Sequence, residues 1–188
     1  MSVVICPGIH DPALTQSFVI GLQSEARKTR IQRLSPLIFP TQDYVALSAF
    51  HMLQFLREHL GCPQTATPVV LISFSAGVVG AIGAAWGWQL LGGKVKALIA
   101  LDGWGVPLYG NFGIHRLSHD YFTHWSWALQ GSGQDNFYAD PQVAHLEMWR
   151  TPQTVAGWWV HAVGKSPIRS RLSAAQFLIM LLELYKEI

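Results

Sequence analysis

Residues 69–81, VVLISFSAGVVGA, decide the fold of this 188-residue chain. The first four residues are β-branched or large and apolar, as expected for a strand that is buried on both faces. The chain from 76 to 93 carries no charge. Its glycines recur at helical spacing, at Gly77, Gly80, Gly83 and Gly87. Glycines at this spacing let a helix approach a sheet or another helix closely. At 18 residues the segment is slightly short for a membrane span, so we predict a strand, a sharp turn and a buried helix.

The flanking segments extend this pattern in both directions. Residues 94–102, KVKALIALD, form a second apolar run, and residues 2–8, SVVICPG, form a third that ends in Pro7 and Gly8. Helices are predicted from Asp11 and Pro12 to about residue 22, over residues 45–60, and from Ser173 to the end of the chain. Apolar strands that alternate with helices indicate a parallel sheet. We expect one α/β domain over residues 1–188, with three layers (α/β/α), a mostly parallel central sheet and no large cap domain.

Two segments are harder to assign. Residues 31–34 are predicted as a further strand, and residues 35–44 as a loop with Pro36 and Pro40. Residues 104–149 are aromatic, rich in histidine and without clear periodicity. Because long irregular segments in compact domains are usually functional, we expect the site, and any lid, in this part of the chain.

The composition excludes several function classes. Charged residues make up 13% of the chain and the net charge is +2, so no basic tract for nucleic acid is present. Cys6 and Cys62 resemble neither a disulfide framework nor a metal-binding cysteine motif, and are expected to be reduced thiols. The N-terminus lacks the pattern of a secretory signal. We expect a cytoplasmic protein without membrane association, and the sequence leaves a homo-oligomer open.

The turn itself carries the chemistry. Ser75 stands between the predicted strand and the predicted helix, with the small residues Ser73 and Gly77 two positions before and after it. Small residues are needed there because a strained turn packs them against neighbouring backbone while it exposes the hydroxyl. The segment resembles the G-x-S-x-G nucleophile elbow of the α/β-hydrolase superfamily of esterases and lipases. The resemblance spans residues 3 to about 159 and departs from the motif at Ser73.

This resemblance implies roles for several residues. Ser75 is the expected nucleophile, and the amide of Ala76 is the first donor to the oxyanion. A second donor comes from the loop after the first strand, where the amide of Ile9 or His10 is suitably placed. The His10 side chain belongs either to the substrate pocket or to an ordinary loop. Trp104 is the expected wall of an apolar acyl pocket.

The acid and the base follow the serine in the chain order of the family. Asp102 is preferred as the acid because it ends an apolar strand, where open α/β sheets gather their sites. Asp120 and Asp140 are its rivals, because the family more often places the acid one strand later.

Four histidines are candidates for the base: His115, His119, His124 and His145. His145 is preferred, because it lies in a late loop that resembles the final histidine loop of the family. His119 stands next to Asp120, but adjacent residues on a strand point to opposite faces and do not pair readily.

The predicted reaction is acyl transfer from a small ester or related acyl substrate through an acyl-enzyme on Ser75. No cofactor is expected, and the histidines lack the H-E-x-x-H spacing of a zinc site. The alternative is a catalytically inactive α/β-hydrolase-like module for binding or assembly. In that case the apolar C-terminal helix and the basic residues Lys165, Arg169 and Arg171 dock a partner or an anionic membrane surface.

Overall fold

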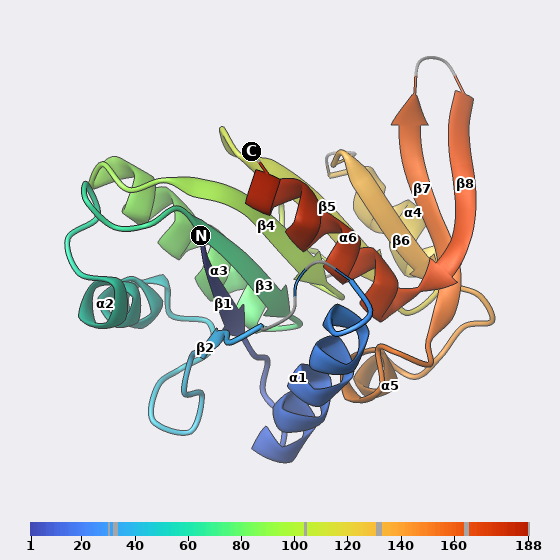
Figure 1. The fold of residues 1–188 in the computed structure, drawn as a ribbon, viewed down its shortest axis with the longest axis horizontal. Coiled ribbons are helices and arrows are strands. Elements are labelled where there is room, and N and C mark those ends of the chain that lie inside the picture. The colour runs from blue at the N-terminus through green and yellow to red at the C-terminus, as the bar shows by residue number, and fades with distance from the viewer. Residues whose placement is uncertain (30, 32–33, 104, 131–132, 164–165, 188) are drawn as a thin grey trace.

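One eight-stranded sheet runs through the protein (Figure 1). The computed structural model describes residues 1–29, 31, 34–103, 105–130, 133–163 and 166–187. The strand order is β2-β1-β3-β4-β5-β6-β7-β8. The strands are β1 (Ser2–Cys6), β2 (Leu37–Ile38), β3 (Val69–Phe74), β4 (Val95–Leu101), β5 (Gly113–Ser118), β6 (Asp135–Ala139), β7 (Ala156–Val163) and β8 (Ser166–Ser173).

The first six strands are parallel, and β7 and β8 are added in antiparallel pairing. The order reverses direction at β1 and β3, since the chain moves from β1 to β2 on one side and then returns to the other. Open α/β sheets bind their ligands at the carboxyl ends of the strands at such a point. The residues that follow β1 and β3 are therefore placed where a site is expected.

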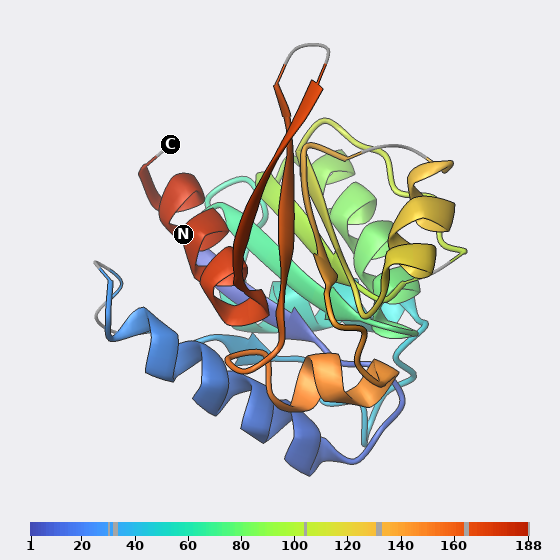
Figure 2. The same cartoon turned by 90° about the vertical axis from the view of Figure 1, so that its right-hand side faces the viewer.

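Helices cover both faces of the sheet (Figure 2). One face packs against α1 (Pro12–Ala26), α5 (His145–Arg150) and α6 (Ala174–Glu187). The other packs against α2 (Ala49–Leu60), α3 (Gly77–Leu90) and α4 (Tyr121–Ala128). Each face has its own apolar core because the strand side chains alternate between the two faces. The predicted three-layer architecture with a mostly parallel sheet and no large cap domain is confirmed.

The glycines of α3 explain its close packing. A Cβ at Gly77 would overlap the carbonyl oxygens of Cys6 and Pro7, and one at Gly80 would overlap that of Ala46. Gly83 and Gly87 lie against Ala49 and Leu53 of α2 in the same way. The helix is therefore held against β1 on one side and α2 on the other. No helix among the described residues has both the length and the apolar character needed to cross a bilayer.

Capping residues fix the starts of two helices as the sequence predicts. The Asp11 carboxylate accepts a hydrogen bond of 2.8 Å from the amide of Ala13. Ser173 and Gln176 form a reciprocal pair at α6, because each side chain accepts from the backbone amide of the other.

Three predictions of structure are wrong. The short strand near β1 is residues 37–38, within the segment predicted as a loop; of residues 31–34, only 31 and 34 are described, and neither is in a strand. Residues 104–149 contain β5, α4, β6 and α5, so most of the described part of that segment forms regular elements of the fold, whereas residues 105–112 are in no helix or strand. Its strands were hidden because they bury polar residues, including His115, Arg116 and Asp135.

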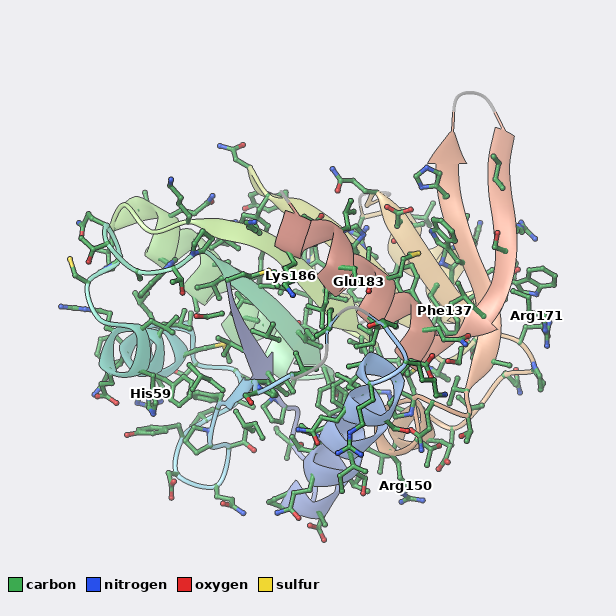
Figure 3. The ribbon with its side chains drawn as sticks, in the orientation of Figure 1. His59, Phe137, Arg150, Arg171, Glu183 and Lys186 are labelled. Carbon is green, nitrogen blue, oxygen red and sulfur yellow. The ribbon has the colours of Figure 1, made fainter. Side chains whose placement is uncertain are left out.

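The basic residues assigned above to a docking surface lie on a strand where they are described. Arg169 and Arg171 are on β8, and Figure 3 shows Arg171 pointing outward at this edge of the sheet. Lys165 is outside the described residues. Residues 168–171 are all exposed, so this strand lacks the buried face that gives an alternating apolar pattern.

Candidate functional site

Ser75 occupies a backbone conformation that is rare for any residue but glycine. Its φ angle is 51°, and its amide donates a 2.9 Å hydrogen bond to the carbonyl of Leu101 at the end of β4. A non-glycine residue in the left-handed region is energetically costly, and such residues cluster at functional sites. Ser75 thus has the strained strand-to-helix turn of a nucleophile elbow.

The loop after β1 lies directly beside this turn. A Cβ at Gly8 would lie 3.0 Å from both the carbonyl oxygen of Phe74 and the Cβ of Ser75. Among the described residues, the amides of Ile9 and Ala76 donate to no backbone carbonyl. Ala76 also stands at the N-terminus of α3, where amides carry partial positive charge. Both amides therefore lack a backbone acceptor in the part of the chain that the structure describes.

Asp102 is the buried carboxylate of the site. It follows β4, has a φ angle of 49° and is 6% exposed. Its Oδ1 accepts from the backbone amide of His119 at 2.9 Å, and its Oδ2 lies 3.0 Å from Nδ1 of His145. Burial raises the pKa of this carboxyl, but its interactions with His119 and His145 outweigh burial and lower it overall. Asp102 is therefore ionised at neutral pH and holds the Nδ1 proton of His145.

A stack of rings fixes His145 relative to the nucleophile. His145 and Trp149, one helical turn apart on α5, lie on either side of the Phe74 ring, with centroid distances of 4.6 and 4.8 Å. Trp149 stacks in turn on Phe18 of α1 at 3.7 Å. Because Phe74 precedes Ser75 in the chain, the stack ties the imidazole to the elbow.

On both His145 and Ser75, the atom that catalysis would use is free. Neither Nε2 of His145 nor Oγ of Ser75 has a hydrogen-bond partner among the described residues. In an enzyme without substrate, the hydrogen bonds used in catalysis are often long, and they tighten only when substrate binds.

His119 is a second imidazole on the same carboxylate. Its Nδ1 lies 3.1 Å from Oδ2 of Asp102, but the atom is buried and not aligned for a hydrogen bond. Contact with Asp102 raises the pKa of His119, although burial acts in the opposite direction. No local sequence pattern predicts this contact. The signal for it was positional, because β4 and β5 are parallel neighbours and their carboxyl ends meet at one edge of the sheet.

The rival acids have other partners. Asp120 caps α4, where it accepts from the amide of Thr123 at 2.6 Å. Its Oδ2 also lies 3.5 Å from Nε2 of His119, so the prediction that these two neighbours do not pair is wrong, because residue 119 lies past the end of β5 and the alternation of a strand does not apply to it. Asp140 accepts from Trp158 Nε1 at 2.7 Å and lies 3.7 Å from Arg171. Neither contacts His145, so the geometry favours Asp102 as the acid.

The remaining two histidines are also engaged elsewhere. His115 is fully buried between the Asp135 carbonyl and the Tyr185 hydroxyl, and burial lowers its pKa. His124 of α4 packs against the ring of Tyr138 on β6, and no contact joins it to Asp102 among the described residues. The geometry therefore favours His145 as the base.

Two clefts flank the site. One of about 460 Å³ is lined by Asp102, His119, Asp120, Phe122, Thr123 and His145. The other, of about 360 Å³, is lined by Ile9, His10, Pro12 and residues 41–46. His10 places its ring 5.6 Å from Phe74, with Nε2 buried and unpartnered. Ser75 lines neither cleft, and Trp104, the predicted pocket wall, lies outside the described residues.

A larger hollow lies elsewhere. A groove of about 870 Å³ runs beside α2 and is lined by Phe50, Arg57, Cys62 and neighbouring residues. It brings no nucleophile, acid and base together, so chemistry and not volume identifies the site. Cys6 and Cys62 are both free thiols, the first buried and the second exposed.

Comparison with known proteins adds no assignment, because no family model, no curated protein and no solved structure matches this chain.

Proposed function

We propose that this protein is a serine hydrolase of the α/β-hydrolase type that cleaves a carboxylic ester or a related acyl bond. One observation carries the proposal: Ser75 stands in a left-handed turn between β3 and α3, and the imidazole of an aligned Asp102–His145 pair stacks on Phe74, the residue before it. A strained serine serves no purpose in a passive binding module, whereas a nucleophile elbow requires it.

The proposed reaction uses each group in turn. Oγ of Ser75 attacks the carbonyl carbon while Nε2 of His145 takes the hydroxyl proton. Asp102 keeps the other proton on Nδ1 and stabilises the imidazolium. The amides of Ile9 and Ala76 donate to the developing oxyanion. His145 then gives its proton to the leaving alcohol, and a water molecule activated by the same imidazole hydrolyses the acyl-enzyme.

The surroundings favour a modest, apolar acyl group. Ile9 and Val45 line the 360 Å³ cleft and are both exposed, at 75% and 56%. Exposed apolar side chains beside a concave surface typically mark a site for an apolar ligand. His10 lines the same cleft, which supports a role for it in the substrate pocket.

Hydrolysis of p-nitrophenyl acetate and butyrate tests the proposal. Ser75→Ala is expected to reduce turnover to the background rate, because it removes the attacking oxygen. Ser73→Ala is the matched control, since it deletes a hydroxyl two residues away that contacts only the Ile99 carbonyl, at 3.4 Å. Unchanged turnover in Ser75→Ala would exclude Ser75 as the nucleophile.

A further inference from the structure

Asp102 faces two imidazoles, one more than a hydrolytic triad uses. Nδ1 of His145 lies 3.0 Å and Nδ1 of His119 lies 3.1 Å from the same oxygen, Oδ2. Only the His145 contact is aligned as a hydrogen bond, and the buried Nδ1 of His119 has no hydrogen-bond partner. The proposed acyl transfer assigns no role to this second imidazole, that of His119.

The three groups have the spacing of metal ligands. One ligand atom from each of Asp102, His119 and His145 lies within 4.8 Å of the others. Bonds of about 2.0–2.1 Å to a tetrahedral zinc ion place neighbouring ligand atoms about 3.3 Å apart. Oδ2 of Asp102 lies 3.0 and 3.1 Å from the two Nδ1 atoms, close to this value, and the ligand atoms of the two imidazoles lie within 4.8 Å of each other. Small movements of two side chains would therefore admit an ion.

The chemistry and the access also fit zinc. Two imidazole nitrogens and one carboxylate oxygen form a donor set typical of Zn²⁺, with the fourth position left for water. The 460 Å³ cleft is lined by all three residues, and the His145 side chain is 41% exposed. An ion can thus reach the cluster from solvent.

We propose that Asp102, His119 and His145 form a reversible zinc site whose occupation inhibits the enzyme. The metal site stands on the geometry alone, whereas the inhibition rests on the proposed function. The cluster is already held by its own contacts and by the backbone amide of His119, so it does not need the ion in order to form. This separates a regulatory site from a structural one.

Inhibition follows from the tautomer of His145. Without metal, the Nδ1 proton points at Asp102, and the lone pair of Nε2 is free to accept the Ser75 proton. Zinc takes the lone pair of Nδ1, so the single proton of the neutral ring must reside on Nε2. No proton is gained or lost by the ring, but Nε2 becomes a donor and no longer serves as a base. Zinc also occupies the carboxylate oxygen that oriented the imidazole.

Isothermal titration with ZnCl₂, on protein freed of metal by EDTA, tests the site without any need for activity. The wild type is expected to bind one ion, and His119→Gln to bind it at least 10-fold more weakly. His161→Gln is the matched control, because it removes the imidazole of another Asp–His pair, Asp135–His161. His119→Cys is expected to restore binding, since a thiolate is also a zinc ligand.

Circular dichroism establishes that each variant is folded. The site is overturned if the wild type binds no zinc or if His119→Gln binds it as tightly as the wild type does.

The inhibition is measured separately. Zinc is expected to abolish p-nitrophenyl butyrate hydrolysis at the concentration that saturates the site, and EDTA to restore it. Saturation with no change in turnover would overturn the inhibitory role. Stoichiometric zinc binding by a protein that hydrolyses no ester and whose Ser75 is unreactive would contradict the proposed function while leaving the metal site in place.

Discussion

Two Asp–His pairs lie at opposite ends of the parallel strands. Asp102 and His145 meet beyond the carboxyl ends of the parallel strands, whereas Asp135 and His161 are register partners at the start of β6 and the end of β7. Both carboxylates are buried, at 6% and 8% exposure. The pair as a chemical unit is therefore not what distinguishes the candidate site.

The difference lies in the surroundings. Asp135 also accepts from Trp159 Nε1 at 2.8 Å, and its carbonyl faces His115, which contacts the Tyr185 hydroxyl. Burial and the charge of Asp135 raise the pKa of Tyr185 to about 12, so this hydroxyl stays protonated. No nucleophile in a strained turn is present there among the described residues. An Asp–His pair alone thus also serves to join strands, and the proposed function depends on Ser75 and the amides beside it.

Substitutions of the two histidines, His145 and His161, should differ most in their effect on ester turnover. His145→Gln is expected to lower ester turnover by a factor of up to about 10⁶, because the base and the nucleophile act as a unit. His161→Gln is expected to keep the wild-type rate. His119→Gln should retain a larger fraction of the rate than His145→Gln, since its ring is not aligned with Asp102. Steady-state kinetics on folded variants checks this order, and a reversed order would move the base to His119.

Substitutions of the two aspartates, Asp102 and Asp135, should differ by less in their effect on turnover. Asp102→Asn is expected to reduce turnover by a factor on the order of 10⁴, because the amide favours the wrong tautomer of His145. Asp135→Asn keeps an oxygen acceptor and should alter the stability more than the rate. Turnover by Asp102→Asn equal to that of the wild type would assign the acid elsewhere, with Asp140 the next candidate.

A smaller effect concerns the pH dependence of stability, to which His124 of α4 contributes. Burial, and then the charges of Arg169 and Arg116, lower the pKa of His124 to about 4. The unfolded chain therefore binds a proton between about pH 6.5 and 4 that the native protein does not, so stability falls as the pH falls through this window. We expect this histidine to account for about 1–2 kcal/mol of the stability lost between pH 7 and 5.

Urea unfolding at the two pH values measures this contribution. His124→Gln should reduce the loss of stability, whereas the same change at the exposed His59 of α2 (Figure 3) should not. An unchanged pH dependence in His124→Gln would show that other groups cause the loss.

The parts of the fold that could be predicted from sequence are those with uniform apolar patterns. Residues 69–101 show a buried strand, a glycine-rich helix and a second strand because nearly every side chain there is apolar. β5 and β6 bury Arg116, Ser118 and Asn136, so their pattern resembled a loop. Tertiary contacts, such as Arg116 lying 5.3 Å from the ring of Trp127, allow these polar residues in a strand, and no local pattern reveals such contacts.

The candidate site also has features that could be predicted from sequence and features that depend on tertiary contacts. The resemblance to the G-x-S-x-G motif and to the chain order of that family, with the strand-end position of Asp102, brought Ser75, Asp102 and His145 forward as candidates, and the side chains of the last two lie 3.0 Å apart. The contact between Asp102 and His119, and the position of Phe74 between His145 and Trp149, depend on the packing of β5 and α5. Short-range patterns carry no information about such contacts between distant segments.

Labelling with a fluorophosphonate probe, followed by peptide mapping, tests the central claim most directly, because the probe reacts only with an activated serine. One adduct is expected on the peptide that contains Ser75, present in wild type and Ser73→Ala and absent in Ser75→Ala. An unlabelled wild-type protein, or labelling that persists in Ser75→Ala, would contradict it.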